Sequence, residues 1–346
     1  MIKKECFTAE WIEQVSSELH YNDKNLIEKV IRALSLLEML VKAGCPLVFK
    51  GGTALMLILG KSAHRLSIDI DVICPPGTNI EDYLKSFADF GFINLELVER
   101  KQRDDADIPK SHSKFFYQIA YRNDTDAQSY ILLDVLYEDI HYFRTQQIAI
   151  DCPFIRLEGK PLMVTVPSAE DILGDKLTAF APNTTGIPYY KNGRSCSMEI
   201  AKQLYDVGRL FENVSDLQIT KEAFRKIAVV ELSYRCFGTD IGQVFNDIRQ
   251  TALCISTRGK AGEGDFDLIQ DGIIRVKSFM YKQRYLIDHA IIDAARAAYL
   301  ATLIEKGINE IESYSNNPAD IKDMVIRPSL PNKLNKLRSN LPEAYY

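Results

Sequence analysis

The chain carries Lys50-Gly51-Gly52-Thr53 and, after a short run of helical character, Arg65-Leu66-Ser67-Ile68-Asp69-Ile70-Asp71-Val72. The first stretch predicts a glycine turn into a helix, whose free backbone N–H groups and positive dipole end favour a phosphate. The second stretch predicts a strand, on which Ser67, Asp69 and Asp71 share one face while the apolar residues between them face a core. Two carboxylates so close repel each other unless a divalent cation lies between them. A phosphate cradle followed closely by a metal site indicates nucleotide chemistry.

The composition limits the kinds of protein that this chain can be. Its 346 residues carry a net charge of −5, and no apolar run approaches the about 20 residues that a membrane span needs. The N-terminus lacks the apolar core of a signal peptide. Seven scattered cysteines without a C-x-x-C pair argue against structural zinc and favour a reducing compartment. We therefore expect a cytoplasmic protein with no membrane partner, on which any nucleic-acid surface is local.

The first half of the chain predicts a mixed sheet. A βαβ start followed by antiparallel strands indicates a sheet with helices packed on it. The predicted helices cover residues 24–43, 53–59 and 79–90, and the predicted strands cover 46–49, 68–74, 92–98, 114–121 and 129–137.

The second half of the chain is predicted to be helical. Ser168-Ala169-Glu170-Asp171 has the form of a capping box and begins a helix that runs through Ala179. A loop rich in Gly, Pro and Asn follows at residues 182–194. We therefore predict an α+β protein, with a mixed-sheet core domain at residues 1–165 and a mainly helical domain at residues 166–346. Helical periodicity continues over 198–212, 220–235, 240–256 and about 266–306.

Asp134 is the candidate for a third acid. It stands alone inside the apolar strand Tyr130–Tyr137, where a bare carboxylate is costly to bury. A place at the sheet edge or an arginine partner would also explain it. In a two-metal site, ions about 3.5–4 Å apart bridge the attacking and leaving oxygens. Asp69, Asp71 and Asp134 together supply carboxylates for such a site.

Lys176 lies on the apolar stripe of the helix at residues 168–180, four residues after Ile172. A lysine that faces inward needs a negative partner, and a triphosphate is one such partner. The alternative is a lysine that buries its stem and extends its charge to water. Asp206 flanks the apolar stripe of the next helix. Three roles stay open for it: a salt bridge with Lys176, orientation of Lys176, or contact with nucleotide or acceptor.

The order of these features resembles a known superfamily. A glycine turn, a D-x-D strand and a third acid on a later strand are the pattern of the polymerase-β-like nucleotidyltransferases. More narrowly, residues 50–72 resemble the first motif of the AbiEii family. These proteins are nucleotidyltransferase toxins of abortive-infection toxin–antitoxin systems, and the MenT proteins belong to them.

Two helical motifs extend the resemblance, so that it spans residues 50–206. Asp175-Lys176-Leu177-Thr178-Ala179-Phe180 is similar to the family's D-K-L-x-A helix, with Lys176 in the functional position. Lys202-Gln203-Leu204-Tyr205-Asp206-Val207 is similar to the K-D-L-Y-D-L helix. Asp206 matches the second acid of that helix, whereas Gln203 replaces the first.

The resemblance implies an enzyme that transfers NMP from an NTP to an acceptor hydroxyl and releases pyrophosphate, with two Mg²⁺ ions as the expected cofactor. Two roles stay open for Arg65, which either neutralises phosphate charge or ties down Asp69. Thr53 either caps its helix or hydrogen-bonds a phosphate. The residues assigned to catalysis are Asp69, Asp71, Asp134, Lys176 and Asp206. The residues assigned to metal binding are Asp69, Asp71 and Asp134. The residues assigned to nucleotide binding are Gly51, Gly52, Thr53, Arg65, Ser67 and Lys176.

The resemblance also implies the biological setting. The expected acceptor is the 3′ end of tRNA, and blocked tRNA charging would arrest growth. The expected partner is a cognate antitoxin, a winged-helix repressor encoded alongside. Two alternatives stay open: a transferase that modifies a small molecule such as an aminoglycoside, or a protein hydroxyl, and a non-catalytic nucleotide-binding module.

Overall fold

The computed structural model describes residues 1–98, 109–121, 127–214, 216–235, 238, 240–326 and 332–346. The chain divides into two compact units. The first contains Met1–Ser168 and the short segment Ser278–Arg284, and the second contains Ala169–Lys277 and Tyr285–Tyr346. Within these described ranges, none of the helices combines the length and apolar character needed to cross a bilayer. The prediction of a mixed sheet followed by a mainly helical region is confirmed.

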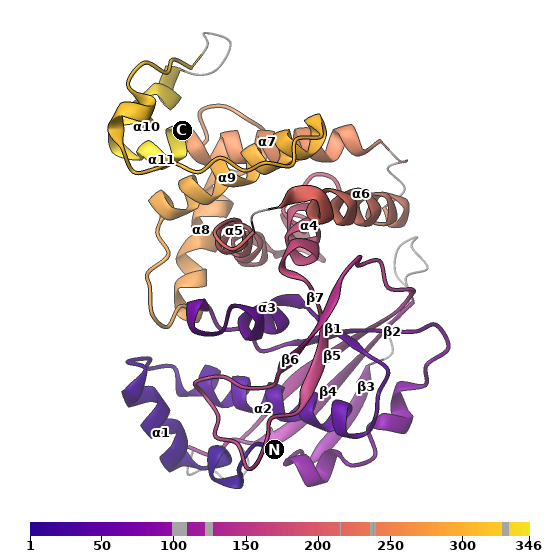
Figure 1. Ribbon diagram of the computed structural model, residues 1–346. Coiled ribbons are helices and arrows are strands. Elements are labelled where there is room, and N and C mark those ends of the chain that lie inside the picture. The colour runs from indigo at the N-terminus through magenta and orange to yellow at the C-terminus, as the bar shows by residue number, and fades with distance from the viewer. Residues whose placement is uncertain (99–108, 122–126, 215, 236–237, 239, 327–331) are drawn as a thin grey trace. The chain divides into compact units, whose positions relative to one another are not determined.

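The first unit is built on a five-stranded sheet of order β1-β2-β5-β4-β3 (Figure 1). The β2 and β5 strands run parallel, whereas the other three neighbouring pairs are antiparallel. A separate antiparallel pair, β6 and β7, was not predicted from the sequence. The strands are β1 (Val48–Lys50), β2 (Ile70–Cys74), β3 (Asn94–Val98), β4 (Lys110–Gln118), β5 (Gln128–Tyr137), β6 (Thr145–Ala149) and β7 (Met163–Pro167).

The expected βαβ start is wrong, because β1 and β2 are antiparallel. Helix α3 (Gly51–Leu59) begins at the residue after β1 ends. The chain then returns to the beginning of α3, where the Thr53 hydroxyl donates a hydrogen bond of 2.7 Å to the Asp69 carbonyl. Since β2 starts beside the end of β1, the two strands run in opposite directions. Lys50 pairs with Asp71 in this register.

One face of the sheet packs into the core of this unit. Alternate residues of β5, including Leu133 and Val135, are buried there with Val72 of β2. Helix α2 (Lys24–Lys42) contributes most of its side chains to the same core, and α1 (Ala9–Glu18) adds Trp11. The residues between the buried ones on β5, such as Asp134, lie on the opposite face.

Residues 79–90 do not form the predicted single helix. They form two short 3-10 helices, Ile80–Tyr83 and Phe87–Phe90, of which the second ends at Gly91 in a left-handed conformation. Such helices are typical of short segments. Each of the two buries one apolar residue in the core, Ile80 and Phe90 respectively.

The second unit is formed mainly by helices, and α5 has a strongly amphipathic sequence. A small hairpin of β8 (Tyr190–Lys191) and β9 (Arg194–Ser195) overlaps the end of the predicted loop. The helices are α4 (Ala169–Ala179), α5 (Ser197–Phe211), α6 (Leu217–Tyr234), α7 (Ile241–Ser256), α8 (Phe266–Val276), α9 (Ile287–Lys306), α10 (Leu337–Asn340) and α11 (Pro342–Tyr345).

The helical periodicity at about residues 266–306 does not form one continuous helix. The region forms two helices, α8 and α9, separated by Ser278–Arg284, which belongs to the sheet unit. Leu66 N–H donates to the Phe279 carbonyl at 2.8 Å, and Tyr281 N–H donates to the His64 carbonyl at 3.1 Å. The Tyr281 ring packs against Phe154. These long-range contacts outweigh the local helical periodicity of the segment.

Candidate active site

The glycine turn is shaped by the acidic strand beside it. Gly51 has a φ of +78°, and a Cβ at this position would lie 2.1 Å from Asp71 Oδ2. A Cβ on Gly52 would lie 2.7 Å from Ser67 Oγ and 2.9 Å from the Arg65 guanidinium. Both glycines are therefore needed so that the start of α3 can approach the D-x-D strand closely. Lys50 is the N-cap of α3 and makes no side-chain cap hydrogen bond, so the first N–H groups of the helix receive no cap from it.

Two further residues of the predicted nucleotide site order the backbone around the acids. Thr53 is completely buried, and its hydroxyl holds the Asp69 carbonyl rather than capping the helix, whose N-cap is Lys50. Arg65 is also buried, and its guanidinium donates to the Leu66 carbonyl at 3.0 Å. Side chains of the motif thus hold the backbone carbonyls of Leu66 and Asp69 in place.

The sheet register brings two predicted metal ligands side by side. Asp71 on β2 is the direct partner of Asp134 on β5, and paired residues of adjacent strands point to the same face about 5 Å apart. Asp69 precedes β2 by one residue and is exposed. Carboxylate oxygens are the donors that Mg²⁺ takes from proteins, so the chemistry of this set fits the ion that the resemblance implies. As the side chains lie, no group of three or more His, Cys, Asp or Glu in the described part of the chain could hold a metal ion.

His112 is a neighbour of this site that sequence reasoning missed. It lies on β4 directly opposite Asp134, and its Nδ1 shares a hydrogen bond with Asp134 Oδ1. The other ring nitrogen, Nε2, is buried and has no hydrogen-bond partner among the residues that the structure describes. No pattern in the sequence indicates this contact, because the histidines show no metal-ligand spacing. Only the pairing of β4 with β5 brings His112 and Asp134 together. The structure thus gives Asp134 a histidine partner instead of the arginine considered from the sequence.

Lys176 has its negative partner inside the helical unit. Its Nζ lies 3.0 Å from Asp206 Oδ2 and donates to Gln203 Oε1 at 2.9 Å. The lysine comes from α4 and both partners come from α5, and only 9% of the Lys176 side chain and 2% of the Asp206 side chain are exposed. The lysine is therefore buried, not extended to water. Of the roles left open for Asp206, the structure shows the salt bridge with Lys176, and it gives Gln203 a role as well.

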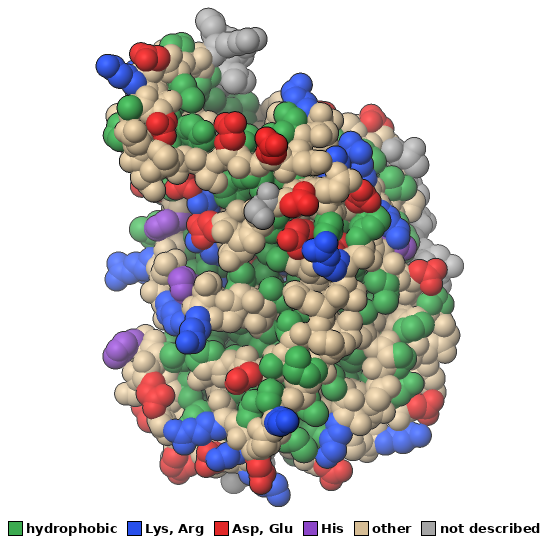
Figure 2. Space-filling view, in the orientation of Figure 1, with side chains coloured by type: hydrophobic (Ala, Val, Ile, Leu, Met, Phe, Trp, Pro, Cys, Tyr) green, Lys and Arg blue, Asp and Glu red, His purple; other side chains and the backbone are tan. Residues whose placement is uncertain are grey.

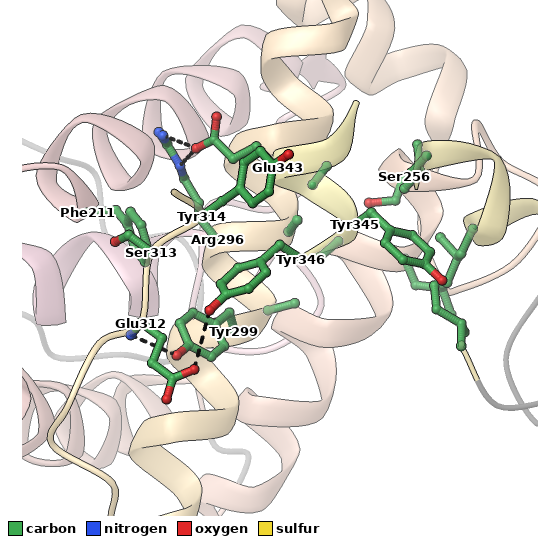
Figure 3. Close-up of a pocket in the computed structure, with 18 of the residues that line it drawn as sticks. Phe211, Ser256, Arg296, Tyr299, Glu312, Ser313, Tyr314, Glu343, Tyr345 and Tyr346 are labelled. Atoms are coloured by element: carbon green, nitrogen blue, oxygen red, sulfur yellow. Dashed lines mark hydrogen bonds and ion pairs between the residues drawn. The ribbon is translucent and has the colours of Figure 1, made fainter. Parts of the chain in front are cut away.

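A cavity of about 950 Å³ lies elsewhere in the helical unit (Figure 3). Its wall carries the aromatic residues Tyr299, Tyr314 and Tyr346, and the ion pair between Arg296 and Glu343. None of the predicted site residues lines this cavity. The predicted residues instead form two groups: Gly51, Gly52, Thr53, Arg65, Ser67, Asp69, Asp71 and Asp134 in the sheet unit, and Lys176 and Asp206 in the helical unit.

Comparison with known proteins yields one family match and several similar structures. Residues 34–316 match the family described as "Nucleotidyl transferase AbiEii toxin, Type IV TA system". JHP933 from Helicobacter pylori is 16% identical with a TM-score of 0.39, and the alignment covers 89% of this chain and 95% of that one. MenT4, a nucleotidyltransferase toxin from Mycobacterium tuberculosis, is 14% identical with a TM-score of 0.42, over 85% of this chain and 89% of that one. No curated protein matches the sequence significantly. The family match includes every residue of the predicted site.

Proposed function

The chain belongs to the AbiEii family of nucleotidyltransferase toxins, and we propose that it transfers NMP from an NTP to the 3′ end of tRNA. The terminal hydroxyl of the acceptor attacks the α-phosphorus in line. A new bond from phosphorus to the acceptor oxygen forms, the bond to the β-phosphate breaks, and pyrophosphate leaves. Positioning and charge neutralisation supply most of the catalysis in such reactions.

The placement of Asp71 supports this proposal most directly. Its carboxylate occupies the space that a Gly51 side chain would fill, and it pairs in register with Asp134. Acidic oxygens therefore lie beside the N-terminal end of α3, where helix N–H groups favour phosphate. A phosphate-binding element and carboxylates for a divalent cation are the two parts that nucleotidyl transfer needs.

We assign the following roles to the sheet unit. Asp69 and Asp71 would hold Mg²⁺ at the triphosphate, and Asp134 would help to hold a second ion at the acceptor. When bound, these ions neutralise charge on the phosphates and lower the pKa of the attacking hydroxyl. The N–H groups of Gly51 and Gly52 bind phosphate oxygens, while Thr53 and Arg65 keep the backbone around Asp69 in place.

We assign Lys176 to the same reaction, as a cation that binds the triphosphate. In the structure its charge is neutralised by Asp206 at 3.0 Å. Asp206 is then a positioning residue, because it holds the ammonium group in a buried place where a lysine alone would be costly. Gln203 supplies a neutral hydrogen-bond acceptor where the family has an acid, so this side chain adds no second negative charge beside Lys176.

The family is that of a type IV toxin–antitoxin system, so a cognate antitoxin is the implied partner. We propose that it is a winged-helix repressor encoded beside this protein. Expression of the wild-type toxin alone should arrest growth, and co-expression of the repressor should relieve the arrest. A toxin with Asp71→Ala should permit growth without the repressor.

One labelling assay tests the reaction and the acceptor. The purified protein is incubated with Mg²⁺, total RNA and each α-³²P-labelled NTP in turn, beside Asp71→Ala and the control Asp82→Ala. Asp82 is an exposed aspartate of the same unit, with a side chain that is 59% exposed. We expect label in tRNA from the wild type and from Asp82→Ala, but not from Asp71→Ala.

Other outcomes contradict the proposal in identifiable ways. Label that appears only in protein or in small molecules rules out the tRNA acceptor. If Asp71→Ala still labels tRNA, the carboxylate of Asp71 is not needed for the reaction. Chelation of divalent ions with EDTA should abolish labelling, and unchanged labelling after chelation would contradict the metal assignment.

A further inference from the structure

The open face of the sheet continues from the acids toward an exposed aromatic group. On β5, Tyr130 lies on the same face as Asp134, because the two residues are separated by an even number of positions. Tyr130 pairs in register with Phe116 of β4, just as Asp134 pairs with His112. Tyr130 is 40% exposed, whereas Ile131, Leu133 and Val135, which lie on the opposite face of β5, are buried. Tyr130 lies four positions before Asp134 on the strand, which corresponds to about 13 Å.

Two lysines and a second ring surround Tyr130. The Nζ of Lys29 lies 5.7 Å from the centre of the Tyr130 ring, and the Nζ of Lys114 lies 5.6 Å from it. The Phe116 ring is 5.7 Å away, tilted by 55°. Lys29 comes from α2, so three elements of the sheet unit contribute to the group. We call Lys29, Lys114, Phe116 and Tyr130 the aromatic–lysine patch.

We infer that the aromatic–lysine patch binds the unpaired nucleotides that precede the acceptor hydroxyl of the RNA substrate. Exposed rings on the open face of a sheet stack on single-stranded bases, and this stacking tolerates any base. Lysines beside the rings bind the phosphates between those bases. A strand that stacks on Tyr130 can extend along β5 toward Asp134 and Asp71, where its terminal hydroxyl would react. This inference rests on the proposed transfer to RNA and assigns the surface that binds the acceptor.

Charge complementarity favours RNA over a protein partner at this surface. Both lysines lie at the Tyr130 ring. The Nζ of Lys114 also lies 3.2 Å from Glu96 Oε1, and the side chains of Lys114 and Glu96 are 29% and 49% exposed. Such exposed pairs contribute little stability, so a phosphate can replace Glu96 at low cost. On the face shown in Figure 2, Lys and Arg side chains are interspersed with acidic ones and form no broad basic surface. Since the chain also carries a net charge of −5, a local patch with stacking rings is a better fit than general electrostatic attraction.

Binding of a fluorescein-labelled RNA hexamer that ends in CCA tests the inference on the full-length protein. We expect Tyr130→Leu to raise the Kd about tenfold, because it removes one stacking platform. Tyr130→Phe keeps the ring and should bind within about twofold of the wild type. Lys114→Gln should weaken binding and reduce the dependence of log Kd on log salt by about 0.7. Phe143→Leu and Lys85→Gln are matched controls in the same unit, since Phe143 is 51% exposed and the Lys85 side chain is 77% exposed.

The results separate this inference from the proposed function. Asp71→Asn should lose transfer yet bind the hexamer as the wild type does. In transfer assays, Tyr130→Leu should raise the KM for RNA about tenfold, as for binding, and leave the Kd for NTP unchanged. Unchanged Kd and KM in both Tyr130→Leu and Lys114→Gln would overturn the patch, even if tRNA is the acceptor. If label never enters RNA but the patch variants still lose hexamer binding, the proposed acceptor is wrong, and the patch binds RNA without presenting an acceptor hydroxyl.

Discussion

Two side-chain pairs in this protein each contain predicted catalytic residues, and the pairs differ in their exposure to solvent. In the pair between His112 and Asp134 on the sheet, 15% and 39% of the side chains are exposed. In the pair between Lys176 and Asp206 in the helical unit, 9% and 2% are exposed. In the first pair, Asp134 is the more exposed partner, so water reaches its carboxylate and a ligand can compete with His112 for it. The second pair is desolvated, and removal of either partner leaves an uncompensated buried charge.

The comparison separates residues that a ligand can recruit from residues that the fold requires. Asp134 can leave His112 for a metal ion without disturbing the core. Asp206 cannot leave Lys176 unless a negative group, such as a phosphate, replaces it. Substitutions in the two pairs should therefore affect activity and stability in different proportions.

The largest effect is expected at the buried pair. Asp206→Ala leaves the Lys176 ammonium without its carboxylate and should lower the free energy of unfolding by about 3–5 kcal/mol. Urea unfolding monitored by circular dichroism measures the change. The double variant Lys176→Met/Asp206→Leu replaces both charges by apolar groups and should recover most of that stability. It should not recover transfer activity, and full activity of the double variant would contradict the assignment of Lys176.

Asp71→Asn should leave stability nearly unchanged but lower kcat about a hundred- to a thousandfold, as is typical when a group that stabilises transition-state charge is removed. Initial rates of label transfer, together with the melting temperature, measure the two effects. The exposed Asp82→Asn serves as the control. A loss of stability that accounts for the loss of activity would place Asp71 with the structural residues instead.

A third carboxylate extends the comparison within the helical unit. Burial raises the pKa of Asp293 from 3.8 to about 6, against the opposing charges of Arg209 and Arg296. Because the folded protein holds this proton more tightly than the unfolded chain, the stabilising contribution is full below about pH 4 and is lost as the pH rises through 6. Relative to Asp293→Asn, the wild type should therefore gain about 2.5 kcal/mol between pH 7 and pH 4. Parallel stability curves for the two proteins across this range would contradict the raised pKa.

The smallest effect is expected at His112. His112→Ala removes the partner of Asp134 and should lower activity about tenfold, in the range seen for residues that orient metal ligands. The free energy of unfolding should change by less than about 1 kcal/mol. An increase in the Mg²⁺ concentration needed for half-maximal activity would identify a positioning role, which a purely structural residue would not produce. His20→Asn, at an exposed turn with positive φ, is the control.

Local patterns in the sequence predicted much of the architecture. The α2 helix was expected at residues 24–43 and is found at Lys24–Lys42, and strands expected at 68–74 and 129–137 are found at Ile70–Cys74 and Gln128–Tyr137. Their periodicities arise from burial of one face, which neighbouring residues encode. The antiparallel pairing of β1 with β2 was not predictable in this way, since it depends on where the chain returns after α3.

The sequence by itself determined the family, the glycine turn, and the acids at positions 69, 71 and 134. These features depend on residue types at short spacings, which the printed chain displays directly. The tertiary structure decided which groups meet: Asp134 with His112, Lys176 with both Asp206 and Gln203, and Ser278–Arg284 with the sheet unit. The physical reason is that strand register and helix packing join residues 22 to more than 200 positions apart. Such contacts leave no periodic trace in the chain, because each is selected by the burial and hydrogen bonding of the folded molecule.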